Sequence, residues 1–81
     1  IHIHDRLLFR MLIREGAPQT PADAAFGTPE MALAVGRFAA TLPPVVCMVM
    51  AGHEDGIIAF APDPQDARNI LWDAYSRSRQ Q

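Results

Sequence analysis

The chain opens on a short alternation of apolar and polar residues, IHIH at positions 1–4. A period of two predicts a strand, with His2 and His4 on one face and the two isoleucines on the other. Asp5 is a good helix cap, and the apolar segment RLLFRMLIR predicts a helix that stops at Gly16. Three arginines of this helix are four residues apart and therefore share one face: Arg6, Arg10 and Arg14. We expect this face to contact solvent or another subunit, and the alternative is that it binds an anion.

A second helix is predicted from the GTPE motif at positions 27–30. The preceding segment, GAPQTPADAAFG at 16–27, reads as a connecting loop because of its prolines and glycines. Thr28 suits the N-cap, Pro29 suits the first helical position, and Glu30 favours the positive end of the helix dipole. Apolar residues then recur at near-helical spacing before two prolines end the helix: Met31, Val35, Phe38 and Leu42, then Pro43 and Pro44.

The remaining pattern predicts a hairpin and a last helix. VVCMVM, residues 45–50, is a continuous apolar run typical of a central strand covered on both faces. GHEDG at 52–56 predicts a turn, and IIAFA at 57–61 predicts the second strand of the hairpin. Asp63 and Pro64 then begin a helix. Its buried stripe is predicted at Ala67, Ile70, Leu71, Ala74 and Tyr75, whereas Trp72 lies off it and indicates either an interface or a ring that partly caps the core.

The order β-α-α-β-β-α predicts one α/β domain over residues 1–81, with a few mostly antiparallel strands in a layer covered by helices. Hydrophobic residues make up 49% of the chain, which is rich for a domain that buries only about 60–65% of its unfolded surface. The chain also begins with Ile. We therefore expect a fragment of a larger domain or a subunit of a homo-oligomer, in which a partner surface covers the apolar excess.

Composition narrows the classes of function. A net charge of −2 without a basic block argues against nucleic acid as a partner. Neither a membrane-length apolar run nor a signal-peptide pattern occurs, so we expect no membrane association and a cytoplasmic location. The single cysteine, Cys47, lies in an apolar run that predicts a buried, inert thiol. The chain has no lysine, which excludes Schiff-base chemistry through a lysine amine within it.

The three histidines of the chain predict a metal site. Side chains at i and i+2 of a strand lie roughly 6–7 Å apart at the backbone, so the rings of His2 and His4 can converge on one ion. His53, from a turn beside a neighbouring strand, completes a set of three nitrogens. Three protein ligands and an open position are typical of a catalytic zinc ion. An HxH pair is a weak signal by itself, and the alternative is that His2 and His4 occur together by accident of where the chain begins.

The two acidic residues after His53 have two interpretations. Glu54 and Asp55 can serve as a metal ligand, an outer-shell partner or a general base, and we place the catalytic carboxylate at Glu54. Alternatively, they are ordinary polar residues of the turn.

The order of these motifs resembles the class II aldolase/adducin family. Three motifs occur here in the same order as in the C-terminal half of a typical family member. They are HxH at positions 2–4, GTPEMALAV at 27–35 and a turn that contains His53. The resemblance implies that His2, His4 and His53 bind a divalent metal, usually Zn²⁺. It also implies a fold similar to the C-terminal part of the class II aldolase fold.

The same resemblance implies a lyase of the aldolase, epimerase or dehydratase type. Its substrate would be a sugar phosphate or related hydroxycarbonyl small molecule, which reacts through an enediolate, and its assembly would be oligomeric. The family's turn usually reads Asn-His-Gly, whereas here it reads Gly-His-Glu-Asp-Gly. The glycine- and serine-rich phosphate loops and the acid of the family's N-terminal half have no counterpart in this sequence. The alternative function is therefore a non-catalytic, adducin-like interaction or oligomerisation domain.

Overall fold

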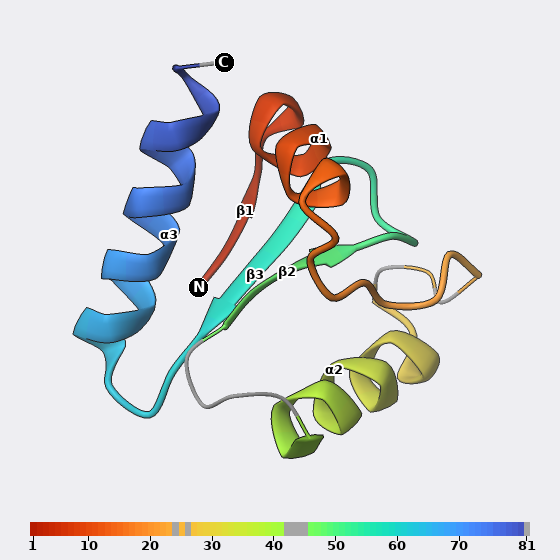
Figure 1. Ribbon diagram of the computed structural model, residues 1–81. Coiled ribbons are helices and arrows are strands. Elements are labelled where there is room, and N and C mark those ends of the chain that lie inside the picture. The colour runs from red at the N-terminus through yellow and green to blue at the C-terminus, as the bar shows by residue number, and fades with distance from the viewer. Residues whose placement is uncertain (24, 26, 42–45, 81) are drawn as a thin grey trace.

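The computed structural model describes residues 1–23, 25, 27–41 and 46–80 (Figure 1). The elements follow the predicted order and are, in sequence, β1 (His2–His4), α1 (Arg6–Arg14), α2 (Pro29–Thr41), β2 (Val46–Met50), β3 (Gly56–Phe60) and α3 (Pro64–Ser78). The prediction of an α/β domain with a few antiparallel strands is confirmed at this level. The predicted helix end at Leu42, Pro43 and Pro44 lies outside the described residues, and so does the side chain of Phe38.

The sheet has three antiparallel strands in the order β1-β3-β2. The prediction of a central strand at residues 45–50 was therefore wrong in one respect. β2 is buried on both faces, as expected, but β3 occupies the centre of the sheet. The continuous apolar run correctly predicted that the strand is buried. Burial on both faces, however, does not determine which strands pair with that strand.

A short segment at residues 18–20 covers the outer edge of β2. Gln19 forms a parallel bridge with Val49, whose N–H donates to the carbonyl of Pro18 at 2.9 Å. The buried hydroxyl of Thr20 accepts a hydrogen bond from the N–H of Ala51 at 3.0 Å. Backbone groups of the edge strand are thus paired without a further strand of regular length. The sequence predicted only a loop here, because prolines and glycines are typical of loops. The pairing with β2 consists of only two backbone hydrogen bonds, which such a pattern does not reveal.

Helices cover both faces of the sheet. Leu8 and Met11 of α1 pack with Ala74 of α3 on the face formed by alternate residues of β2 and β3, including Val49 and Ile57. On the opposite face, two residues of α2 pack against the sheet: Met31 against Met50, with Val35 and Ile58 beside them. In Figure 1, α1 and α3 accordingly lie on the other side of the strands from α2.

The helix ends are fixed by the caps that the sequence predicts. The carboxylate of Asp5 accepts a hydrogen bond from the N–H of Leu8, and the carboxylate of Asp63 accepts one from Gln65. The hydroxyl of Thr28 accepts from the N–H of Met31 at 3.3 Å. Gly16 follows α1 with a φ of 76°, the left-handed conformation expected after a helix.

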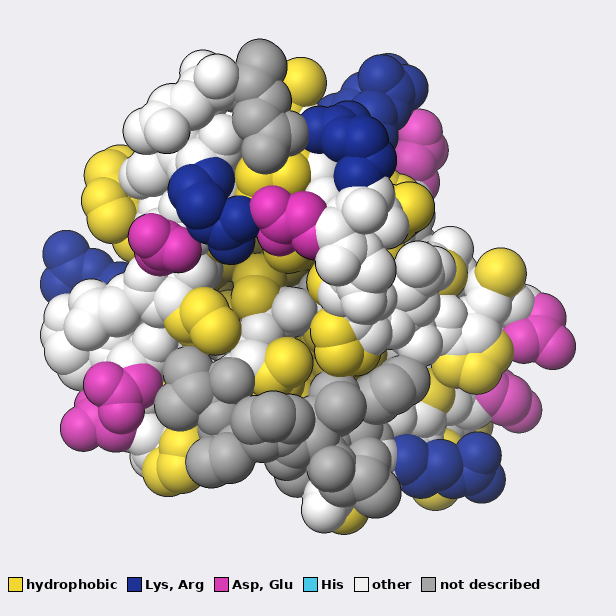
Figure 2. All heavy atoms as spheres, viewed as in Figure 1, with side chains coloured by type: hydrophobic (Ala, Val, Ile, Leu, Met, Phe, Trp, Pro, Cys, Tyr) yellow, Lys and Arg dark blue, Asp and Glu magenta, His cyan; other side chains and the backbone are white. Residues whose placement is uncertain are grey.

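The surface combines scattered charges with several exposed apolar side chains. Figure 2 shows acidic and basic side chains dispersed over one face, with apolar side chains between them. Among the side chains that the structure describes, the exposed large hydrophobic ones are Ile1, Leu7, Ile13, Leu33 and Trp72. Trp72 is 67% exposed, so the alternative in which its ring caps the core does not apply. Among the helices of the described segments, none has the length and apolar character needed to cross a bilayer.

Candidate metal centre

The structure brings the three histidines together. His2 and His4 project from one face of β1, and His53 lies in the turn between β2 and β3. The ring centroids of His4 and His53 are 4.3 Å apart, and those of His2 lie 4.9 Å from His4 and 5.3 Å from His53. One ligand nitrogen from each ring lies within 4.8 Å of the other two. The predicted convergence of these residues is confirmed, and the group could bind a metal ion.

The closest nitrogens show how the rings face one another. The Nε2 atoms of His4 and His53 are 2.9 Å apart, and the two rings are nearly perpendicular, at 89°. Without a cation, such a contact requires one nitrogen to donate its proton to the other. Two nitrogens bound at about 2.1 Å to one tetrahedral ion lie roughly 3.4 Å apart. Three imidazole nitrogens within 4.8 Å of one another are a donor set of the kind that zinc binds.

Antiparallel pairing positions His4 beside the turn that carries His53. His4 lies opposite Gly56 in the register of β1 and β3, so the end of β1 meets the end of the turn. Within the turn, the N–H of His53 donates to the carbonyl of Met50, and the N–H of Gly56 donates to the carbonyl of His53 at 2.9 Å. The last turn residue, Asp55, has a φ of 58°. These bonds fold residue 53 back over the first residue of β3.

Gly56 lies directly beneath the ring of His53. A Cβ atom at this position would lie 2.8 Å from Cδ2 of His53, closer than real Cβ contacts, and 3.0 Å from its carbonyl oxygen. The missing side chain therefore leaves the space into which the ring folds toward His4. This role of Gly56 was not predicted from the sequence. Its only signal was a glycine at the end of the turn, which a tight turn would explain equally well.

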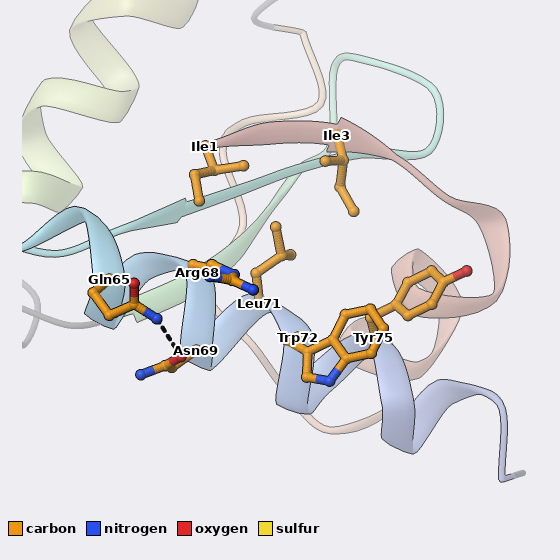
Figure 3. A pocket seen from close by; sticks show the side chains of 8 residues that line it. All are labelled: Ile1, Ile3, Gln65, Arg68, Asn69, Leu71, Trp72 and Tyr75. Atoms are coloured by element: carbon orange, nitrogen blue, oxygen red, sulfur yellow. Dashed lines mark hydrogen bonds between the residues drawn. The ribbon is translucent and has the colours of Figure 1, made fainter.

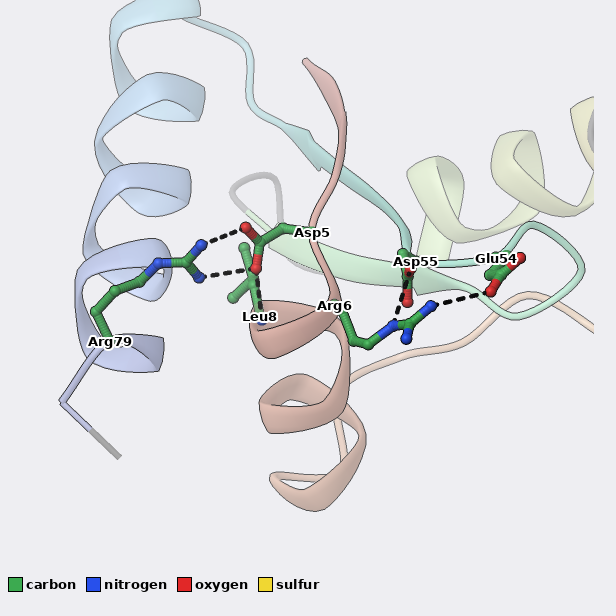
Figure 4. Close-up of polar contacts among 6 residues, drawn as sticks. All are labelled: Asp5, Arg6, Leu8, Glu54, Asp55 and Arg79. Carbon is green, nitrogen blue, oxygen red and sulfur yellow. Dashed lines mark hydrogen bonds and ion pairs between the residues drawn. The ribbon is translucent and has the colours of Figure 1, made fainter.

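The start of α1 secures the same turn (Figure 4). The guanidinium of Arg6 contacts both acidic residues of the turn, with Nη2 3.2 Å from Oε1 of Glu54 and Nε 3.4 Å from Oδ2 of Asp55. The N–H of Asp5 also donates to the carbonyl of Asp55 at 3.0 Å. The histidine group does not include Glu54, whose side chain is 83% exposed and contacts Arg6 instead. The catalytic role of Glu54 therefore stays a prediction.

The electrostatic environment favours a neutral imidazole at His2. Burial lowers the pKa of His2 below its ordinary value, and positive charge on His4, on His53 and on the amino terminus lowers it further. A histidine must be neutral to bind a metal through its ring nitrogen. The lowered pKa therefore keeps His2 available as a ligand at more acidic pH than an isolated histidine would be.

A second ion pair ties α1 to the end of α3. The guanidinium of Arg79 contacts the carboxylate of Asp5, with Nη1 2.8 Å from Oδ1 (Figure 4). This hydrogen bond is the main reason why the pKa of Asp5 is lowered, and the bond from Leu8 acts in the same direction. Asp5 thus joins β1, α1 and α3 immediately after His4.

The cysteine lies apart from this centre. Cys47 is buried on β2, and burial raises the pKa of its thiol to about 11. The prediction of a buried cysteine is confirmed, and an ionisation this unfavourable fits an inert thiol.

Comparisons with profiles of known protein families, with curated proteins and with solved structures give no match to this chain. The class II aldolase resemblance therefore depends on the sequence motifs and their order.

Proposed function

We propose that His2, His4 and His53 bind one divalent metal ion, with Zn²⁺ favoured, and that the chain is the metal-binding part of a class II aldolase-like lyase. The observation that supports the proposal is the convergence of three ligand nitrogens within 4.8 Å from residues as far apart in the chain as positions 2 and 53. Three imidazoles leave a coordination position for a substrate oxygen, as in catalytic zinc sites.

When bound, such an ion supplies Lewis-acid polarisation of a hydroxycarbonyl, which favours proton loss to an enediolate. The substrate class in this proposal is a sugar phosphate or related hydroxycarbonyl. The residues of the chain hold the site and handle the proton. Glu54, at the exposed rim beside His53, accepts the proton from the carbon next to the carbonyl, and Arg6 fixes its carboxylate. The chain has no lysine amine to activate the carbonyl instead.

Metal analysis of protein purified without a histidine tag tests the binding step. We expect about one divalent ion per chain, and Co²⁺ substitution should give the visible spectrum of a nitrogen-ligated ion. His53→Ala should lower the affinity by more than the roughly 10–100-fold that loss of an outer-shell partner costs. Arg10→Gln, which changes an exposed arginine of α1, is the matched control. Metal-free wild-type protein with an intact fold would contradict the proposal.

Exchange of the substrate's α-proton in D₂O tests the chemistry, because aldolase, epimerase and dehydratase reactions can all pass through the enediolate. Metal-loaded protein should catalyse deuterium incorporation into at least one member of a panel of ketose and aldose phosphates, measured by NMR. Glu54→Gln should slow this exchange about 10²-fold or more without changing the metal content. A metal-loaded protein without exchange on any substrate would reduce the function to metal binding.

The second candidate is a non-catalytic interaction or oligomerisation domain. The exposed side chains of Leu7, Leu33 and Trp72 favour it, since large apolar groups on a small domain are suited to contacts between subunits. A metal-free protein that sediments as a stable oligomer would support this candidate against the lyase.

A further inference from the structure

A second site lies on the other side of β1 from the histidines. The strand alternates its side chains, so His2 and His4 face the metal centre while Ile1 and Ile3 face α3. Between these isoleucines and α3 is a pocket of about 470 Å³, within the usual range of small-molecule sites (Figure 3). Nothing in the proposed lyase chemistry uses this pocket.

The walls of the pocket are mainly apolar and include a flat aromatic surface. Ile1 and Ile3 form one side, and Leu71, Trp72 and Tyr75 form the other. The rings of Trp72 and Tyr75 are stacked, with centroids 5.7 Å apart and planes 19° apart. Arg79 lies over Tyr75, its Cζ atom 3.9 Å from the ring centroid. The aromatic pair is thus held in place, while Trp72 keeps most of its surface exposed to a ligand.

Arg68 is the one charged side chain among the described residues that line the pocket. It forms no ion pair with any residue that the structure describes. The amides of Gln65 and Asn69 flank this arginine and hydrogen-bond to each other at 3.2 Å. No acidic residue is among the described residues that line the pocket. The complementary ligand is therefore an anion with a flat apolar body.

We propose that this pocket binds an aromatic carboxylate, whose ring packs between Ile3 and Trp72 and whose carboxylate pairs with Arg68. A guanidinium binds a carboxylate through two parallel hydrogen bonds, which an ammonium or an amide does not reproduce. The amide N–H groups of Gln65 and Asn69 supply further donors at the same rim. The aromatic ring of the ligand would stack on the exposed indole of Trp72 and become buried against it.

Trp72 is the only tryptophan in the chain, so its indole N–H gives a single NMR cross-peak that reports directly on the pocket. Titration with 2-naphthoate should shift this peak saturably, and 2-naphthamide, which has the same ring without the charge, should bind about tenfold more weakly. Arg68→Gln should weaken 2-naphthoate binding about tenfold or more. Arg10→Gln, another exposed arginine without an ion pair among the described residues, should leave the affinity within about twofold.

Three results would overturn the proposal. The indole peak could stay in place at millimolar 2-naphthoate, or the amide and the acid could bind equally well. Alternatively, the peak could move on dilution of the ligand-free protein, with sedimentation showing dissociation, which would assign the pocket to a second copy of the chain. Calorimetry on Trp72→Ala complements the NMR, since loss of the indole should weaken binding while circular dichroism shows an unchanged helix content.

Discussion

At the scale of single residues, the candidate metal centre depends on a side chain that is absent. The ring of His53 occupies the space where Gly56 has no Cβ, and His4 lies opposite Gly56 in the sheet. Histidines at positions 2, 4 and 53 are readable in the sequence as ligand types. Their convergence was predicted as well, but the register that places residue 4 at the turn was not, because it depends on pairing between distant segments.

Gly56→Ala should lower metal affinity about tenfold or more, because the new methyl group displaces the ring of His53. Metal titration followed by Co²⁺ absorption measures the effect, and circular dichroism checks that the sheet persists. Gly36→Ala is the control, since a Cβ at that helical position meets nothing within 4 Å. Equal affinities for the two variants would show that the close approach at Gly56 does not position the ring.

His2 gives a pH dependence of known sign. Its lowered pKa means that the folded chain binds a proton less readily than the unfolded chain. Stability from this group is therefore intact above the unfolded pKa of about 6.5 and is lost as pH falls through the lower folded pKa. Between pH 7.5 and 5, metal-free wild type should lose more in Tm than His2→Asn. An identical loss in both proteins would contradict the assignment.

At the scale of elements, local sequence signals predicted most of the structure. Asp5, Thr28 and Asp63 cap the three helices, as their residue types indicate. The strand order and the pairing of Gln19 with β2 could not be predicted in the same way. Alternation and hydrophobic runs describe what one segment buries, whereas sheet order is decided by which segments meet after collapse.

Asp5 joins two kinds of interaction at the start of α1, and matched substitutions separate them. Asp5→Ala should cost about 1–2 kcal/mol of unfolding free energy in urea, because the cap and the contact with Arg79 are both lost. Asp5→Asn keeps the cap acceptor and should cost less. Arg79→Gln should cost less than Asp5→Ala, because Asp5 still accepts the capping hydrogen bond from Leu8.

The Asp5 contribution also depends on pH. Because the folded-state pKa of Asp5 is lowered, its stabilisation is present above the unfolded value of 3.8 and is lost as pH falls through the lower folded value. The difference between wild type and Asp5→Asn should shrink over this acidic range, as measured by urea unfolding. A constant difference would rule out the ionised carboxylate as its source.

At the scale of the whole molecule, the three histidines join β1 to the β2–β3 hairpin. A bound ion would connect β1, at the start of the chain, to the turn between β2 and β3, which comes much later in the chain. Its binding energy would therefore contribute to folding. The short β1 strand has little pairing of its own, with three residues in the ladder. Metal binding and the stability of this strand are therefore expected to be coupled.

Zinc at about 100 times its Kd should stabilise the fold by about 2.7 kcal/mol, which raises Tm by roughly 10–20 °C for a domain of this size. Differential scanning fluorimetry with and without a chelator measures the shift. His53→Ala should show little of this zinc-induced shift in Tm. A wild-type Tm that does not change with zinc would contradict coupling between the site and the fold.

The two faces of β1 make the first strand intolerant of misalignment. A slip of one position against β3 would turn the imidazoles toward α3 and turn both isoleucines away from it. Such a slip would disperse the nitrogens and remove one wall of the pocket at the same time. Correct alignment of this three-residue strand is thus a shared precondition for both of the binding sites proposed above.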